Sequence, residues 1–476
     1  MSGKTRLGLI RQTMTEINPW WRTEDWESTD RDLQAARGSG LDYEAHSLDG
    51  LESGGLYVLR GPRRVGKTVS AKQAISRLIA AGVPRLSIVR LAADGSSASD
   101  IRTAVQNTPL PDPPHGHRWW FIDEITGATG DWALTVKWLR DNLQHFAEAT
   151  VVITGSNAEA LTAATGSWPG RRGQVDDTDR TLLPIGFRTW TDRVIKAAPA
   201  GLPRLGLSDL RTVVGRDAFG AASVWLDTLV RAWDLYLVYG GFPVAAAAAK
   251  RGEPIPDWFL TDIFNVIYND VFAESRASET TASHMVERLW AGIGSPANLA
   301  NIASDLDVDG KTVARHLGYL QNGYLAWDCP QGHGRRWAPR PGAQAKIYAI
   351  DPLVARLAHL RNPGRDDVDP TLLSEMMIGM AVRRAAVAAG RRWEGDNLLF
   401  HLRTPARKEI DFASELLGDV ALEGKFVDDD AWHREAQTVE ASPWSGILAT
   451  RSVLDTSSTD GAWAVPAGIL AYLIDT

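Results

Sequence analysis

Residues 61–68, which read Gly-Pro-Arg-Arg-Val-Gly-Lys-Thr, constrain the fold of this chain more than any other segment. The apolar run 56–60 precedes them and a helical pattern follows them. A glycine-rich turn between a buried strand and a helix exposes backbone N–H groups at the helix N-terminus, where they can bind phosphate groups. We therefore expect a P-loop, and the strand and helix on either side disfavour a chance glycine-rich turn.

Four short apolar runs place this loop in a larger domain. They cover residues 56–60, 86–91, 119–123 and 151–154, with helical or loop segments between them. Runs that are apolar on both faces are typical of buried parallel strands joined by crossovers. The pattern predicts an α/β domain built on a parallel sheet.

The residue types in the loop predict how ATP and Mg²⁺ are held. Backbone N–H groups wrap the phosphates, the Lys67 ammonium reaches the outer phosphates, and the Thr68 hydroxyl binds Mg²⁺. Asn157 follows the fourth run, where small polar groups can sense the γ-phosphate. The candidate nucleotide-binding residues are Gly61, Pro62, Arg63, Arg64, Val65, Gly66, Lys67, Thr68, Val69 and Asn157.

The third run ends in two carboxylates, Asp123 and Glu124. We expect Asp123 to hold Mg²⁺ and Glu124 to orient or deprotonate the attacking water, since phosphoryl transfer needs charge compensation and an aligned nucleophile. The alternative interpretation is that the two carboxylates are only surface charges at a strand end. The P-loop earlier in the chain makes this interpretation less favourable. The chain has no Asn-Lys-x-Asp sequence to read guanine, so an ATPase is favoured over a GTPase or a metabolite kinase.

Two adjacent arginines, Arg171 and Arg172, lie on a predicted loop after the fourth run. Either can supply a positive charge to the γ-phosphate of a neighbouring subunit, which is compatible with a homo-oligomer. A purely structural role is an equally good interpretation of a loop arginine.

Composition restricts the setting in which the chain works. No apolar stretch is long enough to cross a bilayer, and the first residues lack the apolar segment of a secretory signal. The single cysteine, Cys329, can form neither an internal disulfide nor a cysteine cage for a metal. We expect a cytoplasmic protein with no membrane partner. Because the net charge is -7, any contact with nucleic acid must be local.

A chain of 476 residues is expected to form several domains. The patterning predicts a leader at 1–45, a P-loop ATPase core at 46–195, a helical lid or spacer at 196–285, a winged helix at 286–350 and a C-terminal domain at 351–476. Trp225, Leu229 and Trp233 recur at helical spacing in the third of these segments.

Two apolar stripes separated by a break at 307–310 predict a helix-turn-helix over residues 297–321. Lys311, Thr312 and Arg315 lie on or near its second helix and are candidates for DNA contact. Basic residues continue into the next region, where a wing can touch phosphates. These further residues are Arg335, Arg336, Arg340 and Lys346. A solvated surface or a unit that packs between domains accounts for the same pattern.

The last segment carries an acid followed by an acid-x-lysine pattern on adjacent predicted strands. Asp411 ends one strand, Glu423 and Lys425 lie on the next, and Glu375 lies on the preceding helix. Alternation along a strand puts Glu423 and Lys425 on one face. A magnesium-dependent phosphodiesterase needs such groups, with Glu375, Asp411 and Glu423 as candidate metal ligands. Asp411, Glu423 and Lys425 are the candidate catalytic residues. The same sequence pattern is also compatible with a simple ion pair on the surface.

In their order along the chain, these motifs resemble the prokaryotic AAA-type, or archaeal-type, ATPases. The C-terminal domain of that family resembles PD-(D/E)xK nucleases. The resemblance rests on the P-loop, Ile122-Asp123-Glu124, Thr154-Gly155-Ser156, Gly170-Arg171 and the segments 183–187, 240–243, 346–351 and 409–412. It implies a winged helix before the C-terminal domain and an arginine after Gly170 at the γ-phosphate. Gly424 departs from the family pattern, in which a bulkier aliphatic residue is usual.

The expected architecture is thus an α/β multidomain protein with a P-loop AAA-type parallel sheet, a helical lid, a winged helix and a nuclease-like α/β domain. Two functions fit it. In the first, ATP hydrolysis is coupled to DNA binding and to metal-dependent nuclease action of the C-terminal domain. In the second, the ATPase switches a regulatory or interaction protein whose C-terminal domain binds DNA or a protein partner without cleavage.

Overall fold

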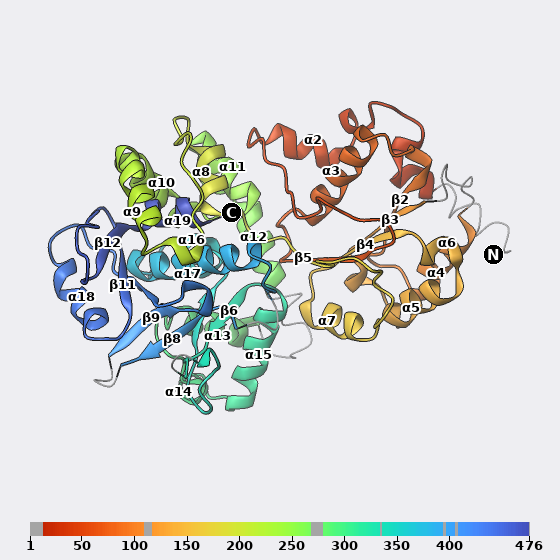
Figure 1. Ribbon diagram of the computed structural model, residues 1–476. Coiled ribbons are helices and arrows are strands. Elements are labelled where there is room, and N and C mark those ends of the chain that lie inside the picture. Colours follow the sequence, from red (N-terminus) through yellow and green to blue (C-terminus); the bar gives the residue numbers. More distant parts are fainter. Residues whose placement is uncertain are drawn as a thin grey trace. The chain divides into compact units, whose positions relative to one another are not determined.

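The computed structural model describes residues 13–108, 117–267, 279–333, 336–393, 397–404 and 408–475. The chain forms two compact units (Figure 1). The first comprises Met1–Leu183 with the short segment Asn322–Tyr324, and the second comprises Pro184–Gln321 with Leu325–Thr476. The described helices include none that is both long enough and apolar enough to span a membrane.

The first unit is built on a five-stranded parallel sheet in the order β2-β3-β4-β1-β5. The strands are β1 (Leu56–Arg60), β2 (Ile88–Ala92), β3 (Trp119–Asp123), β4 (Thr150–Thr154) and β5 (Asp179–Thr181). The prediction of a parallel P-loop sheet is confirmed. The second strand begins later than expected, because Arg85–Ser87 form the 3₁₀ helix η3. The half-buried β5 has no apolar run and was not predicted.

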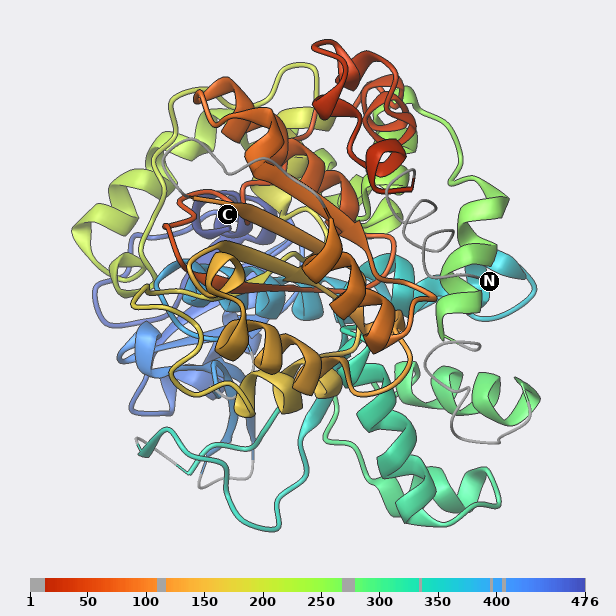
Figure 2. The ribbon, with the colours of Figure 1, turned by 90° about the vertical axis from the view of Figure 1, so that its right-hand side faces the viewer.

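Helices cover both faces of this sheet, as Figure 2 shows for the first unit. One face packs on α3 (Lys67–Ala80), α2 (Arg31–Gly38), η1 (Pro19–Trp21) and η2 (Trp26–Ser28). The other face packs on α4 (Ala98–Asn107), α5 (Trp132–Asn142), α6 (Gln144–Ala147) and α7 (Ala158–Gly166). The short η5 (Ile125–Gly127) follows β3.

The described part of the predicted leader belongs to the first unit. Trp20 and Trp21 both donate their indole N–H to the carbonyl of Ile88, at 3.0 and 2.8 Å. Asn18 donates to the carbonyl of Arg90 at 2.9 Å and accepts from its N–H at 2.6 Å. These bonds pair the otherwise open edge of β2, which satisfies backbone groups that an edge strand leaves exposed. Residues 1–12 of the leader lie outside the described part of the chain.

The second unit contains a mixed sheet in the order β12-β11-β10-β9-β8. Its strands are β8 (Phe400–Arg403), β9 (Glu409–Ala413), β10 (Val420–Gly424), β11 (Ser445–Thr450) and β12 (Trp463–Pro466). Strands β10, β11 and β12 are parallel, whereas β8, β9 and β10 pair in antiparallel fashion. The helix α18 (Trp432–Glu440) packs on β11, and η11 (Glu415–Leu417) joins β9 to β10.

One helix that was expected to end the ATPase core, α8, and the helices that were expected to form a lid pack inside the second unit. They are α8 (Phe187–Val194), η6 (Leu207–Asp209), α9 (Val213–Ala222), η7 (Ser223–Trp225), α10 (Leu226–Tyr239), α11 (Pro243–Arg251) and α12 (Asp257–Asn265). They contact α16 (Pro352–Arg361), α17 (Pro370–Ala388) and the fully buried α19 (Ala467–Ile474). Gly468 of α19 lies so close to α10 that a Cβ there would meet the carbonyl oxygen of Leu229 at 2.5 Å. The expected boundaries at 195, 285 and 350 thus do not coincide with the division into two units.

Three helices and a hairpin follow in the region predicted as a winged helix. They are α13 (Glu279–Trp290), α14 (Leu299–Asp305), α15 (Gly310–Asn322) and the antiparallel pair β6 (Ala326–Cys329) and β7 (Lys346–Ala349). The predicted break between the two helices lies at Asp307, whose φ of 52° is left-handed. Asn298 caps α14 by accepting from two backbone N–H groups.

Candidate nucleotide site and buried carboxylate cluster

The P-loop connects β1 to α3, and two of its residues require glycine. Gly66 has a φ of 101° and is the N-cap of α3. Gly61 has a φ of 145°, and a Cβ there would meet the carbonyl oxygen of Leu182 at 2.0 Å. No L side chain fits either conformation without strain. The loop therefore ends at a helix N-terminus, whose free N–H groups are donors for an anion.

Lys67 is folded back onto its own loop. The residue is only 7% exposed, and Nζ donates to the carbonyl oxygens of Gly61 and Pro62 at 2.8 and 2.9 Å. Burial lowers the pKa of Lys67 to about 8, while the negative charges of Glu124 and Asp123 oppose this shift. The lysine and the two carboxylates therefore share one electrostatic environment.

Asp123 ends β3 with both carboxylate oxygens engaged. Oδ1 accepts a hydrogen bond from the Thr154 hydroxyl at 2.7 Å, and Oδ2 accepts from the Arg90 guanidinium at 2.5 Å. Thr154 in turn accepts from the N–H of Glu124 at 2.8 Å. Arg90 was not foreseen, and its only signal in the sequence is a basic residue inside the apolar strand Ile88–Ala92.

Glu124 adopts a left-handed backbone conformation with a φ of 52°. Such a conformation in a residue other than glycine costs free energy and persists only where its surroundings hold it. Its Oε1 accepts from the hydroxyl groups of Thr126 and Ser156 at 2.9 and 2.7 Å, and from the N–H of Ser156 at 3.2 Å. The carboxylate of Glu124 is therefore fixed beside the end of β4.

The remaining predicted nucleotide-binding residues lie along the loop or after β4. Val65 is buried, Arg63, Thr68 and Val69 are half-buried, and Arg64 is exposed. Asn157 caps α7, since its side chain accepts from the N–H of Ala160 at 2.9 Å. This cap accounts for one of the side-chain oxygen's lone pairs, a structural role that the sequence prediction did not include.

Neither Arg171 nor Arg172 is brought to the P-loop of its own chain. Arg172 donates to the carbonyl oxygens of Leu56 and Thr178 and forms an ion pair with Asp179. These contacts tie β5 to the amino end of β1, whereas the P-loop follows the carboxyl end of that strand. Arg171 pairs with Asp141 at 2.6 Å on the surface.

The donor set of the first unit fits Mg²⁺ and ATP. The hydroxyl of Thr68 and the carboxylate of Asp123 are hard oxygen ligands of the kind that Mg²⁺ prefers. Lys67 and the N-terminus of α3 supply positive charge for phosphates. In chemical terms the arrangement can bind a triphosphate and present a carboxylate, Glu124, to a water molecule.

In the second unit, the predicted acidic residues come together between α17 and the sheet. Glu375 of α17, Asp411 of β9 and Glu423 of β10 are all buried. The N–H of Gly424 donates to Oδ2 of Asp411 at 2.9 Å. A Cβ on Gly424 would meet Cβ and Cα of Glu375 at 2.8 and 2.9 Å. The departure from the family pattern at Gly424 is therefore explained by the close approach of α17 to β10.

A lysine that the sequence reasoning did not assign to this cluster lies at its centre. Nζ of Lys346 lies 2.8 Å from Oδ1 of Asp411, 3.2 Å from Oε1 of Glu375 and 2.7 Å from Oε1 of Glu409. Its side chain is 0% exposed. Lys346 was counted among the basic residues that could touch DNA phosphates, and that prediction is wrong because the side chain is buried among carboxylates.

Burial and mutual repulsion act unequally on the acidic groups of this cluster. They raise the pKa of Glu375 to about 7, with Asp411 as the main repelling charge. Burial also acts to raise the pKa of Asp411, but the ammonium groups of Lys346 and Lys425 hold it below its ordinary value. The pKa of Glu423 lies well above its ordinary value because of burial and the nearby Asp411.

The predicted metal ligands of this cluster do not fit a divalent metal. Within the described ranges, no group of three or more His, Cys, Asp or Glu side chains has an arrangement that could hold a metal ion. The Lys346 ammonium lies between Asp411 and Glu375, where a shared cation would have to bind. Lys425 lies at the rim, 3.4 Å from Glu423 and 4.0 Å from Asp411.

The candidate DNA-contact residues lie on the exposed side of α15. Lys311 and Arg315 are exposed and one helical turn apart. Thr312 is half-buried, and its N–H and its hydroxyl both donate to the carboxylate of Asp309, at 2.8 and 3.1 Å, so Asp309 caps the start of α15 and Thr312 is held by this cap. Arg336 and Arg340 are exposed between β6 and β7. Arg335 lies outside the described residues.

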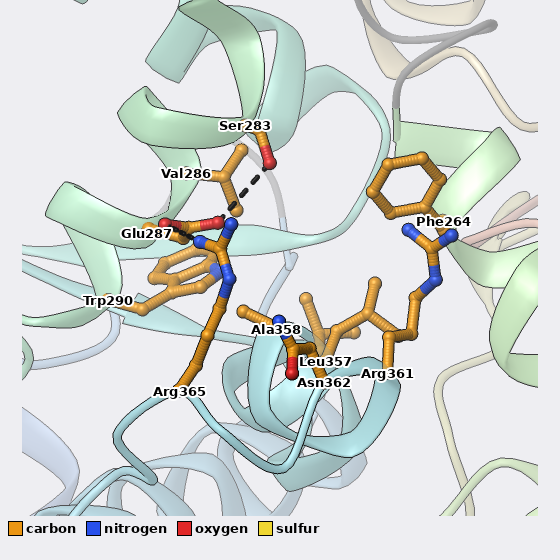
Figure 3. A pocket seen from close by; sticks show the side chains of 11 residues that line it. Phe264, Ser283, Val286, Glu287, Trp290, Leu357, Ala358, Arg361, Asn362 and Arg365 are labelled. Carbon is orange, nitrogen blue, oxygen red and sulfur yellow. Dashed lines mark hydrogen bonds and ion pairs between the residues drawn. The ribbon is translucent and has the colours of Figure 1, made fainter. Parts of the chain in front are cut away.

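Figure 3 shows a cavity of about 300 Å³ in the second unit, between α12, α13 and α16. Val286, Trp290 and Leu357 form part of its apolar wall. At its rim Arg361 stacks over the ring of Phe264, and Arg365 forms an ion pair with Glu287. None of the predicted site residues is among the described residues that line this cavity.

Comparison with known proteins assigns the first unit. Residues 53–189 match the AAA domain family, and residues 230–363 match a domain of unknown function, DUF8612. None of the curated proteins matches the chain significantly. The parallel sheet, the P-loop and the carboxylate pair define a P-loop nucleotide-binding protein. Together with the family match, they make the first unit an AAA-type P-loop ATPase domain.

Several solved structures are similar to the chain at low identity. A Walker-type ATPase of Pyrococcus abyssi is 13% identical, with a TM-score of 0.39 over 71% of this chain and 95% of its own. The ORC2 protein of Aeropyrum pernix, in its ADPNP-ADP complexes, is 12% identical, with a TM-score of 0.33 over 70% and 93%. The ORC1 protein of Aeropyrum pernix in complex with DNA is 14% identical, with a TM-score of 0.26 over 69% and 92%.

Proposed function

We propose that the first unit hydrolyses ATP with Mg²⁺ and that this hydrolysis switches a DNA-contacting second unit. The observation that carries the proposal is the shared environment of Lys67, Asp123 and Glu124, in which each group is held by partners from the P-loop, from β2 or from the end of β4 and the loop after it. Such preorganisation is what phosphoryl transfer requires of a protein, because positioning and charge stabilisation supply most of its catalysis.

Each residue has a defined task in the proposed reaction. Thr68 and Asp123 would hold Mg²⁺, which would neutralise the negative charge that develops on the phosphates. The Lys67 ammonium exchanges its contacts with the carbonyls of Gly61 and Pro62 for phosphate oxygens. Glu124, oriented by Ser156 and Thr126, aligns the water and accepts its proton.

Two variants test this assignment. Lys67→Ala should weaken ATP binding, because it removes the cation that faces the phosphates. Glu124→Gln should keep binding but stall turnover by about a hundredfold or more, as expected when a general base is lost. Binding is measured by calorimetry and turnover by phosphate release. Glu148→Gln, an exposed change in the same unit, is the control. Normal turnover by both site variants would refute the proposal.

The DNA contact is proposed on charge and exposure. Lys311 and Arg315 share an exposed side of α15, and Arg336 and Arg340 add exposed charge on the following hairpin loop. Basic side chains in such an array neutralise phosphates and make binding depend on salt. The order of helices and hairpin also supports a winged helix as the form of this region.

A double variant, Lys311→Gln with Arg315→Gln, tests this contact. It should weaken binding to a fluorescent duplex and reduce the slope of log affinity against log salt by about two, one unit for each lost phosphate contact. Lys250→Gln, an exposed lysine at the end of α11, serves as the control and should leave the slope unchanged. An unchanged slope in the double variant would show that Lys311 and Arg315 do not contact DNA phosphates, which would contradict the proposal.

For the C-terminal sheet, we favour the alternative without cleavage. Nuclease action at Asp411, Glu423 and Lys425 would require a divalent metal, and the residues present do not fit one. The sheet is then a binding module for DNA or a protein partner. Arg171 is the better placed of the two arginines to reach a neighbouring subunit, since Arg172 is engaged within its own chain. A homo-oligomer in the cytoplasm remains the expected setting.

A further inference from the structure

We propose that Lys346 is a built-in cation that takes the position of a divalent metal in the carboxylate cluster, so that the C-terminal sheet is a metal-independent and non-cleaving module. The proposal goes beyond the ATPase function and does not depend on it. It concerns only side chains of the second unit, and its test requires no nucleotide.

The geometry of Lys346 matches the coordination of a cation. A lysine ammonium has three N–H bonds to donate. Nζ lies within 3.2 Å of three carboxylates, those of Glu375, Glu409 and Asp411. Each of its hydrogens therefore has an acidic partner. These partners lie on two elements, α17 and β9, so the lysine joins the helix to the sheet as a bound metal would.

The backbone of Lys346 is paired on both sides. Lys346 pairs with Cys329 in the β6–β7 ladder and forms a bridge with Pro296 on its other side. Tyr348, two residues further along β7, points to the same side and donates its hydroxyl to Oε1 of Glu375 at 2.5 Å. Its ring stacks on Trp327 at 4.6 Å. The strand thus presents two donors to the cluster from a rigid hairpin.

Charge explains why the ammonium and a metal exclude each other. A divalent ion shared by Asp411 and Glu375 would have to displace Nζ from both. The ammonium would then be left buried at 0% exposure without those partners, which is strongly unfavourable. Glu423 is the one predicted ligand that Lys346 does not contact directly, and the nearest ammonium to it is that of Lys425 at 3.4 Å. Each of the three predicted ligands therefore has a lysine ammonium beside it, and Asp411 lies near both lysines.

The test compares Mn²⁺ binding by the full-length chain with and without the lysine. Lys346→Met removes the charge and keeps most of the side-chain volume. Binding is measured by calorimetry and by the electron paramagnetic resonance of free Mn²⁺, without nucleotide. Asp411→Asn is added to each protein to identify the Mn²⁺ binding that occurs at the cluster. Only the Mn²⁺ binding that this substitution abolishes is assigned to the cluster. Lys408→Met, an exposed lysine before β9, is the control.

We expect no Asp411-dependent Mn²⁺ binding in the unchanged protein, and at least a tenfold gain in affinity in Lys346→Met but not in Lys408→Met. A folded Lys346→Met variant without that gain would overturn the proposal. If Lys346→Met does not fold, measurements on the unchanged protein still test the proposal. Asp411-dependent Mn²⁺ binding, or cleavage of linear, branched or single-stranded DNA that Asp411→Asn abolishes, would refute it. Phosphate release from ATP is measured in parallel. It tests the ATPase activity of the first unit independently of the result for the carboxylate cluster.

Discussion

The guanidinium of Arg90 lies 2.5 Å from Oδ2 of Asp123, the carboxylate proposed to hold Mg²⁺. The hydroxyl of Thr154 bonds the other oxygen at 2.7 Å. Each oxygen of Asp123 therefore accepts from one donor of the protein and keeps a further lone pair. A cation that approaches Asp123 meets the positive charge of Arg90, so we expect the guanidinium to compete with Mg²⁺ for this carboxylate.

Replacing Arg90 should therefore lower the Mg²⁺ requirement of the ATPase. In Arg90→Met, the Mg²⁺ concentration for half-maximal phosphate release should fall about tenfold, equivalent to about 1.4 kcal/mol. The exposed Arg102→Met is the control. A rise in the Mg²⁺ requirement would mean instead that Arg90 orients Asp123 for the metal.

The lowered pKa of Lys67 predicts that ATP binding takes up protons. The pKa is about 8 in the free protein, so about half of the lysines are neutral at pH 8. Bound phosphates favour the charged form and raise this pKa, so binding at pH 8 should take up about half a proton, and affinity should fall as the pH rises through 8. Calorimetry in two buffers with different ionisation enthalpies measures the uptake. Lys67→Arg should show no uptake from this position, and equal uptake by both proteins would contradict the assignment.

The two adjacent arginines should differ in what their loss affects. Arg172→Ala removes bonds to two carbonyl groups and to Asp179, so it should destabilise the first unit by about 2 kcal/mol. Arg171→Ala removes a surface ion pair and should cost less than about 1 kcal/mol. Thermal melting measures both changes. If Arg171 serves a neighbouring subunit, its variant should lose ATPase activity at unchanged stability. If activity stays unchanged, Arg171 has no such role.

Gly424 is predicted to be intolerant of any side chain. In Gly424→Ala the added Cβ would meet the Cα and Cβ of Glu375 closer than 3.0 Å, so α17 or β10 must shift. Overpacking of this kind typically costs about 1–3 kcal/mol. Melting temperatures of the variant and the unchanged protein test it. Gly318→Ala on α15, where the Cβ meets nothing within 4 Å, should be neutral or slightly stabilising. Equal effects at both positions would contradict this account.

The sequence by itself determined the features whose physical constraint is local. The P-loop can be recognised in the sequence because Gly61, Gly66 and Lys67 must occur at a fixed spacing in one turn between a strand and a helix. The carboxylate pair after β3 and the shared face of Glu423 and Lys425 follow from the same kind of short-range geometry. Four of the five strands of the first sheet were predicted because each is a continuous apolar run.

The tertiary structure decided which distant residues meet. Arg90 lies 33 positions from Asp123, and Lys346 lies 65 positions from Asp411, so no local pattern links them. Lys346 looks in the sequence like one more member of a basic surface region, and only packing shows that it is buried among carboxylates. Likewise β5 carries no apolar run, because its pairing with β1 rests on backbone bonds and on Arg172. Periodicity shows which side of an element is apolar, whereas the partner of a buried charge depends on how the elements pack.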